Sequence, residues 1–258
     1  MVWGSGEPFI GLMINGNGRC HNRLSGTSAD MVFFDAGETL VHPRPSFPQL
    51  LDSVCREFGV CVDPLQLSRT TRRLMARVEE EQRKGFTFTD DPERSRRFWL
   101  GFYRDLVGEF GYRGGDDGLP HRLYEVFSRP ENYTAYSDAV ETLWVLSELG
   151  IPVGLISNFE PWLHLLLERL GLAAFFRVKV VSGEVGVEKP NPRIFRLALQ
   201  RAGVEAARAV HVGDSPVSDY QGAREAGMRA ILLDRWGRFP DFEGERITDL
   251  RELLFILD

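Results

Sequence analysis

Residues 31–40 read Met-Val-Phe-Phe-Asp-Ala-Gly-Glu-Thr-Leu, and this stretch decides the fold. Its first four residues are apolar and β-prone, as in a short strand that is buried on both faces of a parallel sheet. Asp35 ends the run, and a turn around Gly37 follows it. In parallel sheets, ligands bind beyond the carboxyl ends of the strands. The stretch therefore predicts a buried first strand that presents a carboxylate at a ligand-binding edge.

Further along the chain, four more buried-strand signals alternate with helical segments. The strands are expected at Val153–Ile156, Val178–Val181, Ala209–Val212 and Ala230–Leu233. The helices are expected at Asp138–Leu149, Trp162–Leu170, Asn191–Ala202 and Ser218–Ala226. A glycine follows each of these helices, where a helix C-cap is typical: Gly150, Gly171, Gly203 and Gly227. This alternation predicts an α/β fold, with a parallel sheet and helices on both of its faces.

Residues 42–132 break the alternation. No good buried-strand signal occurs there, and apolar residues instead recur at helical spacing. Examples are Leu50, Leu51, Val54 and Phe58, and later Phe98, Phe102, Leu106, Val107 and Phe110. We predict that residues 42–132 form an inserted helical cap subdomain over the active edge of the sheet. The core would then consist of residues 31–41 and 133–258.

Residues 1–30 differ from the rest of the chain, because they are rich in Gly, Asn and Ser and show no sustained period. The early Glu7 and the short apolar piece Phe9–Ile14 do not fit a secretory signal. We interpret residues 1–30 as a poorly ordered N-terminal extension.

The composition is ordinary for a globular protein, with 43% hydrophobic and 26% charged residues. A formal net charge of −6 gives no electrostatic reason to expect a nucleic acid or an acidic membrane surface as partner. No apolar run approaches the roughly 20 residues that span a bilayer. Cys20, Cys55 and Cys61 lack the spacing of a metal site or a disulfide framework. We expect a cytoplasmic protein with reduced thiols and no nucleic-acid or membrane partner.

Polar residues stand after four of the expected strands, and their convergence is the main functional signal. Taken singly, each is more typical of a helix cap, a turn or a solvated surface. In a parallel sheet, however, all of them meet at one rim, which favours a shared site. In chain order they are Asp35, then Ser157 and Asn158, then Lys189, then Asp214 and Asp219.

These motifs, in this order, resemble those of the haloacid-dehalogenase-like superfamily. The matching segments are Phe33–Leu40, Ile156–Asn158, Lys189–Pro192 and Gly213-Asp214 with Asp219. The likeness runs from Met31 to the C-terminus and includes the helical insertion. It implies a Rossmann-like parallel sheet core with an α-helical cap subdomain inserted just after the first motif.

The resemblance also implies a Mg²⁺-dependent phosphatase of a small phosphorylated metabolite, with Asp35 as the nucleophile. Attack by a carboxylate forms an aspartyl-phosphate and splits one hard hydrolysis into two easier steps. Ser157 can donate to a phosphate oxygen, and Lys189 can offset negative charge on substrate and nucleophile. We expect Asp35, Ser157 and Lys189 to be catalytic, and Ser157, Lys189 and the neighbouring Asn158 to bind substrate.

Mg²⁺ would neutralise the charge that a carboxylate meets when it approaches a phosphate. This ion prefers hard oxygen ligands such as carboxylates, carbonyls and water. By resemblance, its ligands are Asp35, the main-chain carbonyl of Gly37 and Asp214. Asp219 is expected behind them, or joined to the metal through water.

One position departs from the family pattern. Most phosphatases of the family carry a second Asp, a general acid and base, two residues after the nucleophile, and here that residue is Gly37. General acid–base help is worth about 10²–10⁴-fold in rate. We interpret Gly37 as a turn residue that needs positive φ, and Glu38 as a solvent-facing residue at the cleft mouth. Our hypothesis is that Glu38, a cap residue or the substrate supplies the missing proton transfer.

Because Gly37 replaces the family's general acid, functions other than phosphatase must be considered. A catalytically weakened family member could serve as a binding or interaction protein, although binding does not require the whole set of polar residues. A haloacid dehalogenase would not need the metal-binding carboxylate of Asp214. A phosphonate hydrolase would need a cap lysine in an apolar pocket, and the only lysine of the cap, Lys84, lies in a Glu-rich stretch. We rank these alternatives below the phosphatase.

Overall fold

A six-stranded, fully parallel sheet forms the body of the computed structural model, which describes residues 29–115 and 117–257. The strand order is β5-β4-β1-β6-β7-β8, so the first strand lies in the middle of the sheet. The strands are β1 (Met31–Phe34), β4 (Val153–Ser157), β5 (Phe176–Val181), β6 (Ala209–Gly213), β7 (Arg229–Leu233) and β8 (Arg246–Ile247). The predicted α/β fold with a parallel sheet is confirmed.

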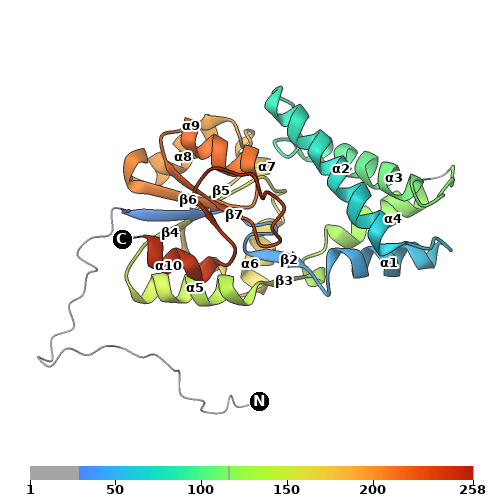
Figure 1. The fold of residues 1–258 in the computed structure, drawn as a ribbon, viewed down its shortest axis with the longest axis horizontal. Coiled ribbons are helices and arrows are strands. Elements are labelled where there is room, and N and C mark those ends of the chain that lie inside the picture. The colour runs from blue at the N-terminus through green and yellow to red at the C-terminus, as the bar shows by residue number, and fades with distance from the viewer. Residues whose placement is uncertain (1–28, 116, 258) are drawn as a thin grey trace, which may run out of the picture.

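The central strand β1 is buried on both faces because helices cover both sides of the sheet. Successive side chains of a strand point to opposite faces. Val32 and Phe34 therefore join one core cluster, and Met31 and Phe33 join the other. Figure 1 shows the two layers of helices, one above and one below the sheet. One layer comprises α5 (Ser137–Glu148), α6 (Leu163–Arg169) and α10 (Leu253–Ile256), and the other comprises α8 (Pro192–Ala202) and α9 (Gly222–Glu225).

Three of the four expected core helices form as predicted, and the fourth differs. Instead of one α-helix over Ser218–Ala226, a π-helical turn at Pro216–Gln221 precedes the short α9. The amide of Tyr220 donates to the carbonyl of Ser215 at 3.1 Å, which widens this turn. Such π turns are frequent at functional sites, and this one carries Asp219. The remaining short helical segments are α7 (Ser182–Val185) and the 3₁₀ turns Pro130–Asn132, Ala173–Phe175, Ala206–Arg208 and Leu250–Glu252.

Four helices form the insertion between the first and second strands of the sheet. They are α1 (Phe47–Glu57), α2 (Pro64–Arg83), α3 (Pro92–Gly108) and α4 (Gly118–Phe127), drawn to the right in Figure 1. They share an apolar core of their own. Sequence sets two of the helix starts, because Asp63 and Asp91 cap the first turns of α2 and α3 and a proline follows each. Of the described helices, none has the length and apolar character needed to cross a membrane.

The insertion leaves and re-enters the core through a two-stranded antiparallel ribbon. Its strands are β2 (Val41–Pro43) and β3 (Tyr133–Ala135). Each is too short to give a period of its own, so neither was predicted. The predicted domain limits stay a prediction. Residues 1–28 of the predicted extension lie outside the described residues.

Two of the three cysteines fall within the described residues, and both are free thiols. Cys55 packs in the core of the insertion, where burial, with a smaller contribution from Asp52, raises its pKa to about 12. Cys61 is exposed. Cys20 lies outside the described residues.

Candidate active site

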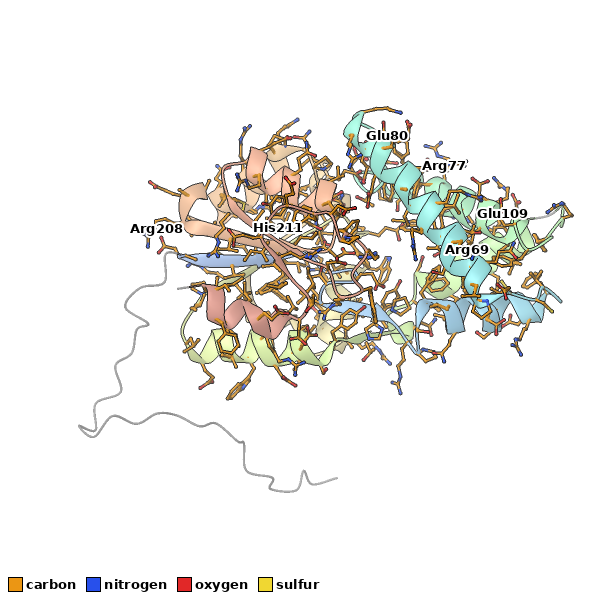
Figure 2. All side chains as sticks on the ribbon, viewed as in Figure 1. Arg69, Arg77, Glu80, Glu109, Arg208 and His211 are labelled. Carbon is orange, nitrogen blue, oxygen red and sulfur yellow. The ribbon has the colours of Figure 1, made fainter. Side chains whose placement is uncertain are left out.

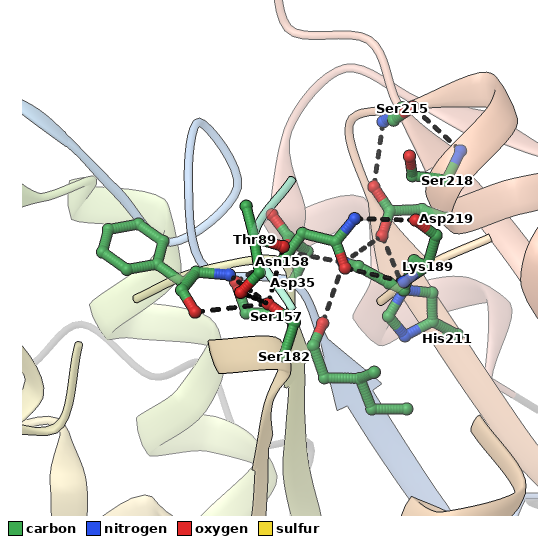
Figure 3. Close-up of polar contacts among 12 residues, drawn as sticks. Asp35, Thr89, Ser157, Asn158, Ser182, Lys189, His211, Ser215, Ser218 and Asp219 are labelled. Carbon is green, nitrogen blue, oxygen red and sulfur yellow. Dashed lines mark hydrogen bonds and ion pairs between the residues drawn. The ribbon is translucent and has the colours of Figure 1, made fainter. Parts of the chain in front are cut away.

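Asp35 stands at the carboxyl end of β1, where the neighbouring strands β4 and β6 also end. Its amide donates to the carbonyl of Val212 at 2.9 Å, which fixes the turn that leaves the strand. Its side chain is almost fully buried. The Ser157 hydroxyl, at the end of β4, donates to Asp35 Oδ1 at 3.0 Å. The first and second predicted motifs are therefore in direct contact (Figure 3).

Lys189 reaches the same carboxylate from the loop before α8. Its Nζ lies 2.6 Å from Asp35 Oδ1, 2.6 Å from Asp219 Oδ1 and 2.9 Å from the carbonyl oxygen of Ile156. The side chain is 2% exposed. Burial alone would lower the pKa of Lys189, but the charges of Asp219 and Asp35 outweigh it and raise that pKa. A buried ammonium thus bridges two carboxylates.

Asn158 orients Lys189 through its main chain. The Asn158 side chain donates to the carbonyl of Lys189 at 2.8 Å and accepts from the Lys189 amide at 2.7 Å. Both ends of the amide group are therefore engaged with the loop that carries the lysine. Substrate binding by Asn158 stays a prediction, and positioning of Lys189 is the role that these contacts indicate.

Asp219 comes from the π-helical turn, and protein donors reach both of its carboxylate oxygens. Oδ1 is 2.9 Å from His211 Nε2 in addition to its contact with Lys189, and Oδ2 accepts from the Ser215 amide at 3.0 Å. Burial opposes ionisation of Asp219, but the charge of Lys189 and the hydrogen bond from His211 lower its pKa well below the usual range. Asp219 therefore stays ionised and serves to hold its neighbours.

His211 is a buried core residue that also contacts Asp219, and no sequence motif identified that contact. The ring is fully buried in β6 and meets the ring of Phe195 edge-on at 5.2 Å. Burial lowers the pKa of His211 despite the nearby Asp219. The neutral ring thus supports Asp219 from behind.

Asp214 completes an acidic cluster with Asp35 and Asp219. Oxygen atoms of the three carboxylates lie within 4.8 Å of one another. Burial raises the pKa of Asp214 to about 7, although Arg238 donates to its Oδ2 at 2.8 Å. Arg238 lies in the loop after β7, and no sequence motif identified it. The cluster gathers more negative charge than its own cations neutralise, which is the condition that favours a bound cation.

The geometry at Gly37 contradicts part of our interpretation of this turn. Gly37 does not have positive φ, whereas Glu38 does, at 55°. A Cβ atom on Gly37 would meet only the Phe159 ring, at the ordinary contact distance of 3.9 Å. Glu38 is half-buried, and its carboxylate accepts from the Tyr136 hydroxyl at 2.9 Å. The turn therefore depends on left-handed backbone at Glu38 and leaves space at Gly37.

A cavity of about 350 Å³ connects this cluster with the helical insertion. All of the predicted site residues border it: Asp35, Gly37, Ser157, Asn158, Lys189, Asp214 and Asp219. Aromatic side chains of α3, α4 and the α2–α3 loop form much of the opposite wall, and no sequence motif identified them. Arg69 and Arg77 of α2, labelled in Figure 2, are exposed, and neither borders the cavity.

Comparison with known proteins gives a consistent family. The family model of haloacid dehalogenase-like hydrolases matches residues 29–227. The haloacid dehalogenase-like hydrolase domain-containing protein 3 of Danio rerio is 34% identical over 79% of this chain and 84% of its own. A phosphoserine phosphatase of Thermus thermophilus is 38% identical over 60% of this chain and 65% of its own. The crystal structure of a HAD phosphatase from Thermococcus onnurineus superposes with a TM-score of 0.55 and 26% identity over 88% and 97% of the two chains.

Proposed function

This chain belongs to the haloacid dehalogenase-like hydrolase family, and from that premise we propose that it is a Mg²⁺-dependent phosphatase of a small phosphorylated molecule. Asp35 is the proposed nucleophile, and an aspartyl-phosphate on Asp35 is the proposed intermediate. One observation carries the proposal: the buried Lys189 ammonium lies 2.6 Å from both Asp35 and Asp219, beside a third carboxylate. The phosphatase names among the relatives support it.

The donor set fits Mg²⁺. Its carboxylates are hard oxygen ligands, and they lie close enough together to share one ion. Asp35 and Asp214 border the cavity within the acidic cluster, so we assign them as direct ligands, with the Gly37 carbonyl beside them. Asp219, whose oxygens are engaged by Lys189, His211 and Ser215, would act from behind or through water. When bound, the ion would neutralise negative charge on a phosphate.

The chain's own residues perform the remaining work. Lys189 and Ser157 both contact Asp35 Oδ1, which fixes the carboxylate and leaves Oδ2 for the reaction. Attack of this oxygen on phosphorus breaks the bond to the leaving oxygen, which takes up a proton from Glu38, from a residue of the insertion or from the substrate itself. Water then cleaves the acyl-phosphate, releases phosphate and restores the carboxylate. Lys189 and Ser157 offset the negative charge that builds up in both steps.

The alternatives have less support at the site. Lys84, the lysine that a phosphonate hydrolase of this type would require, pairs with Glu80 and Glu81 on the surface and does not border the cavity. A dehalogenase has no use for Asp214, which here joins the acidic cluster. A pure binding protein has no need of a buried lysine that links two carboxylates.

Phosphate release from an activated aryl phosphate tests the proposal, with the full chain assayed with and without Mg²⁺. We expect release that requires both Mg²⁺ and Asp35, so that Asp35→Asn lowers kcat to background. Asp241→Asn, at an exposed carboxylate away from the cavity, is the matched control and should keep full activity. Mg²⁺-independent release, or release that persists in Asp35→Asn, would refute the phosphatase. A halide-release assay addresses dehalogenation.

A further inference from the structure

The part of the cavity beyond the acidic cluster has an aromatic wall. On the side of the insertion, the Trp99 ring lies 6.0 Å from Phe88 and 6.0 Å from Tyr103, and Tyr103 lies 5.7 Å from Phe127. All four residues border the cavity. Because each ring packs against the next, this wall is fixed by the protein before any ligand enters.

The core contributes a second aromatic wall. The Trp162 ring lies 5.5 Å from Tyr133 and 4.7 Å from Phe159. The polar atoms of this wall are already engaged, because Trp162 Nε1 donates to Glu160 at 2.8 Å and the Tyr133 hydroxyl donates to the Phe127 carbonyl at 2.8 Å. Their rings therefore offer the cavity an apolar surface rather than free hydrogen-bond donors.

The charges around the cavity disfavour a second anionic group on the ligand. Among the described residues that border it, the lysine and arginine side chains are Lys189 and Arg238, and both pair with carboxylates of the cluster. The charged residues elsewhere on the wall are acidic, namely Glu38, Glu79 and Glu160. A carboxylate or second phosphate on the substrate would find no free cation there, and leaving it unpaired is costly.

The space suits a group larger than a short polar metabolite. The whole cavity, including the space at the acidic cluster, has about 350 Å³, whereas about 150 Å³ of apolar cavity holds a benzene ring, so a phosphate and an aryl group have room together. We infer that the substrate is a phosphate monoester with an apolar, uncharged aryl or alkyl leaving group, held between the two aromatic walls. This inference rests on the proposed phosphatase function and adds the substrate class.

Three aryl phosphates with the same core test the substrate class on the full chain with Mg²⁺. Phenyl and 4-propylphenyl phosphate have leaving groups of similar acidity, so their ratio of kcat/KM reports contacts with the wall. We expect kcat/KM for the propyl compound to be about tenfold higher than for phenyl phosphate, because an added apolar group in a pocket that fits it gains binding free energy. 4-Carboxyphenyl phosphate has the more acidic leaving phenol, yet we expect it to be the poorest of the three.

A charge placed on the wall provides the reciprocal test. Met75 borders the cavity from α2 and is 38% exposed, so a longer polar side chain fits there without being buried. Met75→Arg should raise kcat/KM for the carboxyphenyl compound and lower it for the propyl compound, while Met75→Leu should keep the order of the parent chain.

The outcomes separate the two proposals. Equal kcat/KM values for all three compounds, or preference for the carboxyphenyl compound by the unmodified chain, would overturn the apolar class and leave the phosphatase intact. Failure of all three to release phosphate in a Mg²⁺- and Asp35-dependent way would refute the phosphatase, and the substrate class with it.

Discussion

Gly37 stands where phosphatases of this family carry a general acid and base, and the backbone there tolerates a side chain. Its φ lies outside the left-handed region, and a Cβ atom would meet the Phe159 ring at 3.9 Å. The neighbouring Glu38 is the residue with left-handed φ, and its carboxylate is bonded to Tyr136. The backbone at residue 37 would therefore accept an aspartate, and the general acid is missing only because the residue is glycine.

Gly37→Asp should raise kcat for a phosphate ester with a poor leaving group, by about 10²-fold, because an acid would then protonate the departing oxygen. An aryl phosphate with an acidic leaving phenol should respond much less. Steady-state assays of both compounds measure the difference. Glu38→Gln is the companion variant, and loss of activity in it would identify Glu38 as the present proton donor. If Gly37→Asp still binds Mg²⁺ but turns over no faster, the missing-acid explanation is wrong.

Most residues around the acidic cluster were predictable, because each follows a buried strand of a parallel sheet. Arg238 was not, since it lies in a loop where an arginine is typical of any surface. The contact of His211 with Asp219 was not predictable either, because it depends on the wide π-helical turn. The sequence gives the residue types, but it does not show the π-helical turn that brings Asp219 toward His211.

At the scale of elements, one contact fastens the insertion to the site. Glu188, the residue before Lys189, accepts hydrogen bonds through Oε2 from the amides of Phe88 and Thr89 and from the Thr89 hydroxyl. Ser182 donates to the Thr89 hydroxyl at 2.7 Å. The loop between α2 and α3, which carries Phe88 of the aromatic wall, is thereby tied to the loop that carries the active-site lysine.

Thr89→Val should loosen this attachment, because it removes a buried donor while keeping the shape of the side chain. We expect the free energy of unfolding to fall by about 1–3 kcal/mol, and KM for an aryl phosphate to rise more than kcat falls. Urea denaturation and steady-state kinetics measure the two effects. Thr87→Val, in the same loop, is the matched control, because among the described residues its hydroxyl accepts a hydrogen bond from Arg94 alone. Equal behaviour of the two variants would contradict the attachment.

The stability that Glu188 contributes through this attachment depends on pH. Burial raises the pKa of Glu188 above its ordinary 4.5 despite the hydrogen bonds from Thr89, and Oε1 is without a partner among the described residues. A raised folded-state pKa means that the contribution of Glu188 to stability is complete below pH 4.5 and is lost as the pH rises through the raised value. Glu188→Gln should flatten this part of the stability profile.

The long elements of the core were predictable, whereas the shortest were not. The strands over residues 153–157 and 209–213 read as short, largely apolar runs bounded by turn residues, and their alternation with helical segments indicates strands. By contrast, the ribbon strands Val41–Pro43 and Tyr133–Ala135 and the edge strand Arg246–Ile247 are too short to show a period. Pairing with distant segments creates them, and that information is not local.

At the scale of the whole molecule, the cavity is lined both by the part that carries the sheet and by the helical insertion, which have separate apolar cores. The acidic cluster lies at one edge of the sheet. The first aromatic wall belongs to the insertion, and the second belongs to the core. Burial raises the pKa of Asp214 to about 7. Near neutral pH, ionising this buried carboxylate therefore costs free energy in the folded chain when no cation is bound. A divalent cation would remove that cost.

Mg²⁺ should therefore stabilise the folded chain against unfolding. Mass action gives about 2.7 kcal/mol when the free ion is at one hundred times its Kd. Urea denaturation at pH 7.5 with and without Mg²⁺ measures the shift in midpoint. Asp214→Asn should reduce the shift strongly, whereas Asp241→Asn, at an exposed position, should not. Identical denaturation curves with and without Mg²⁺ would exclude this site.

The ribbon of Val41–Pro43 and Tyr133–Ala135 has a consequence for how such a protein changes over generations. Because the chain departs and returns along adjacent strands, the codons for residues 44–132 can be exchanged as a cassette without re-registering any strand of the sheet. The reactive groups lie outside that cassette, whereas much of the surface that meets the leaving group lies inside it. A duplicated gene whose new insertion keeps the contact with Glu188 can thus acquire a new leaving-group preference while the residues at the edge of the sheet stay the same.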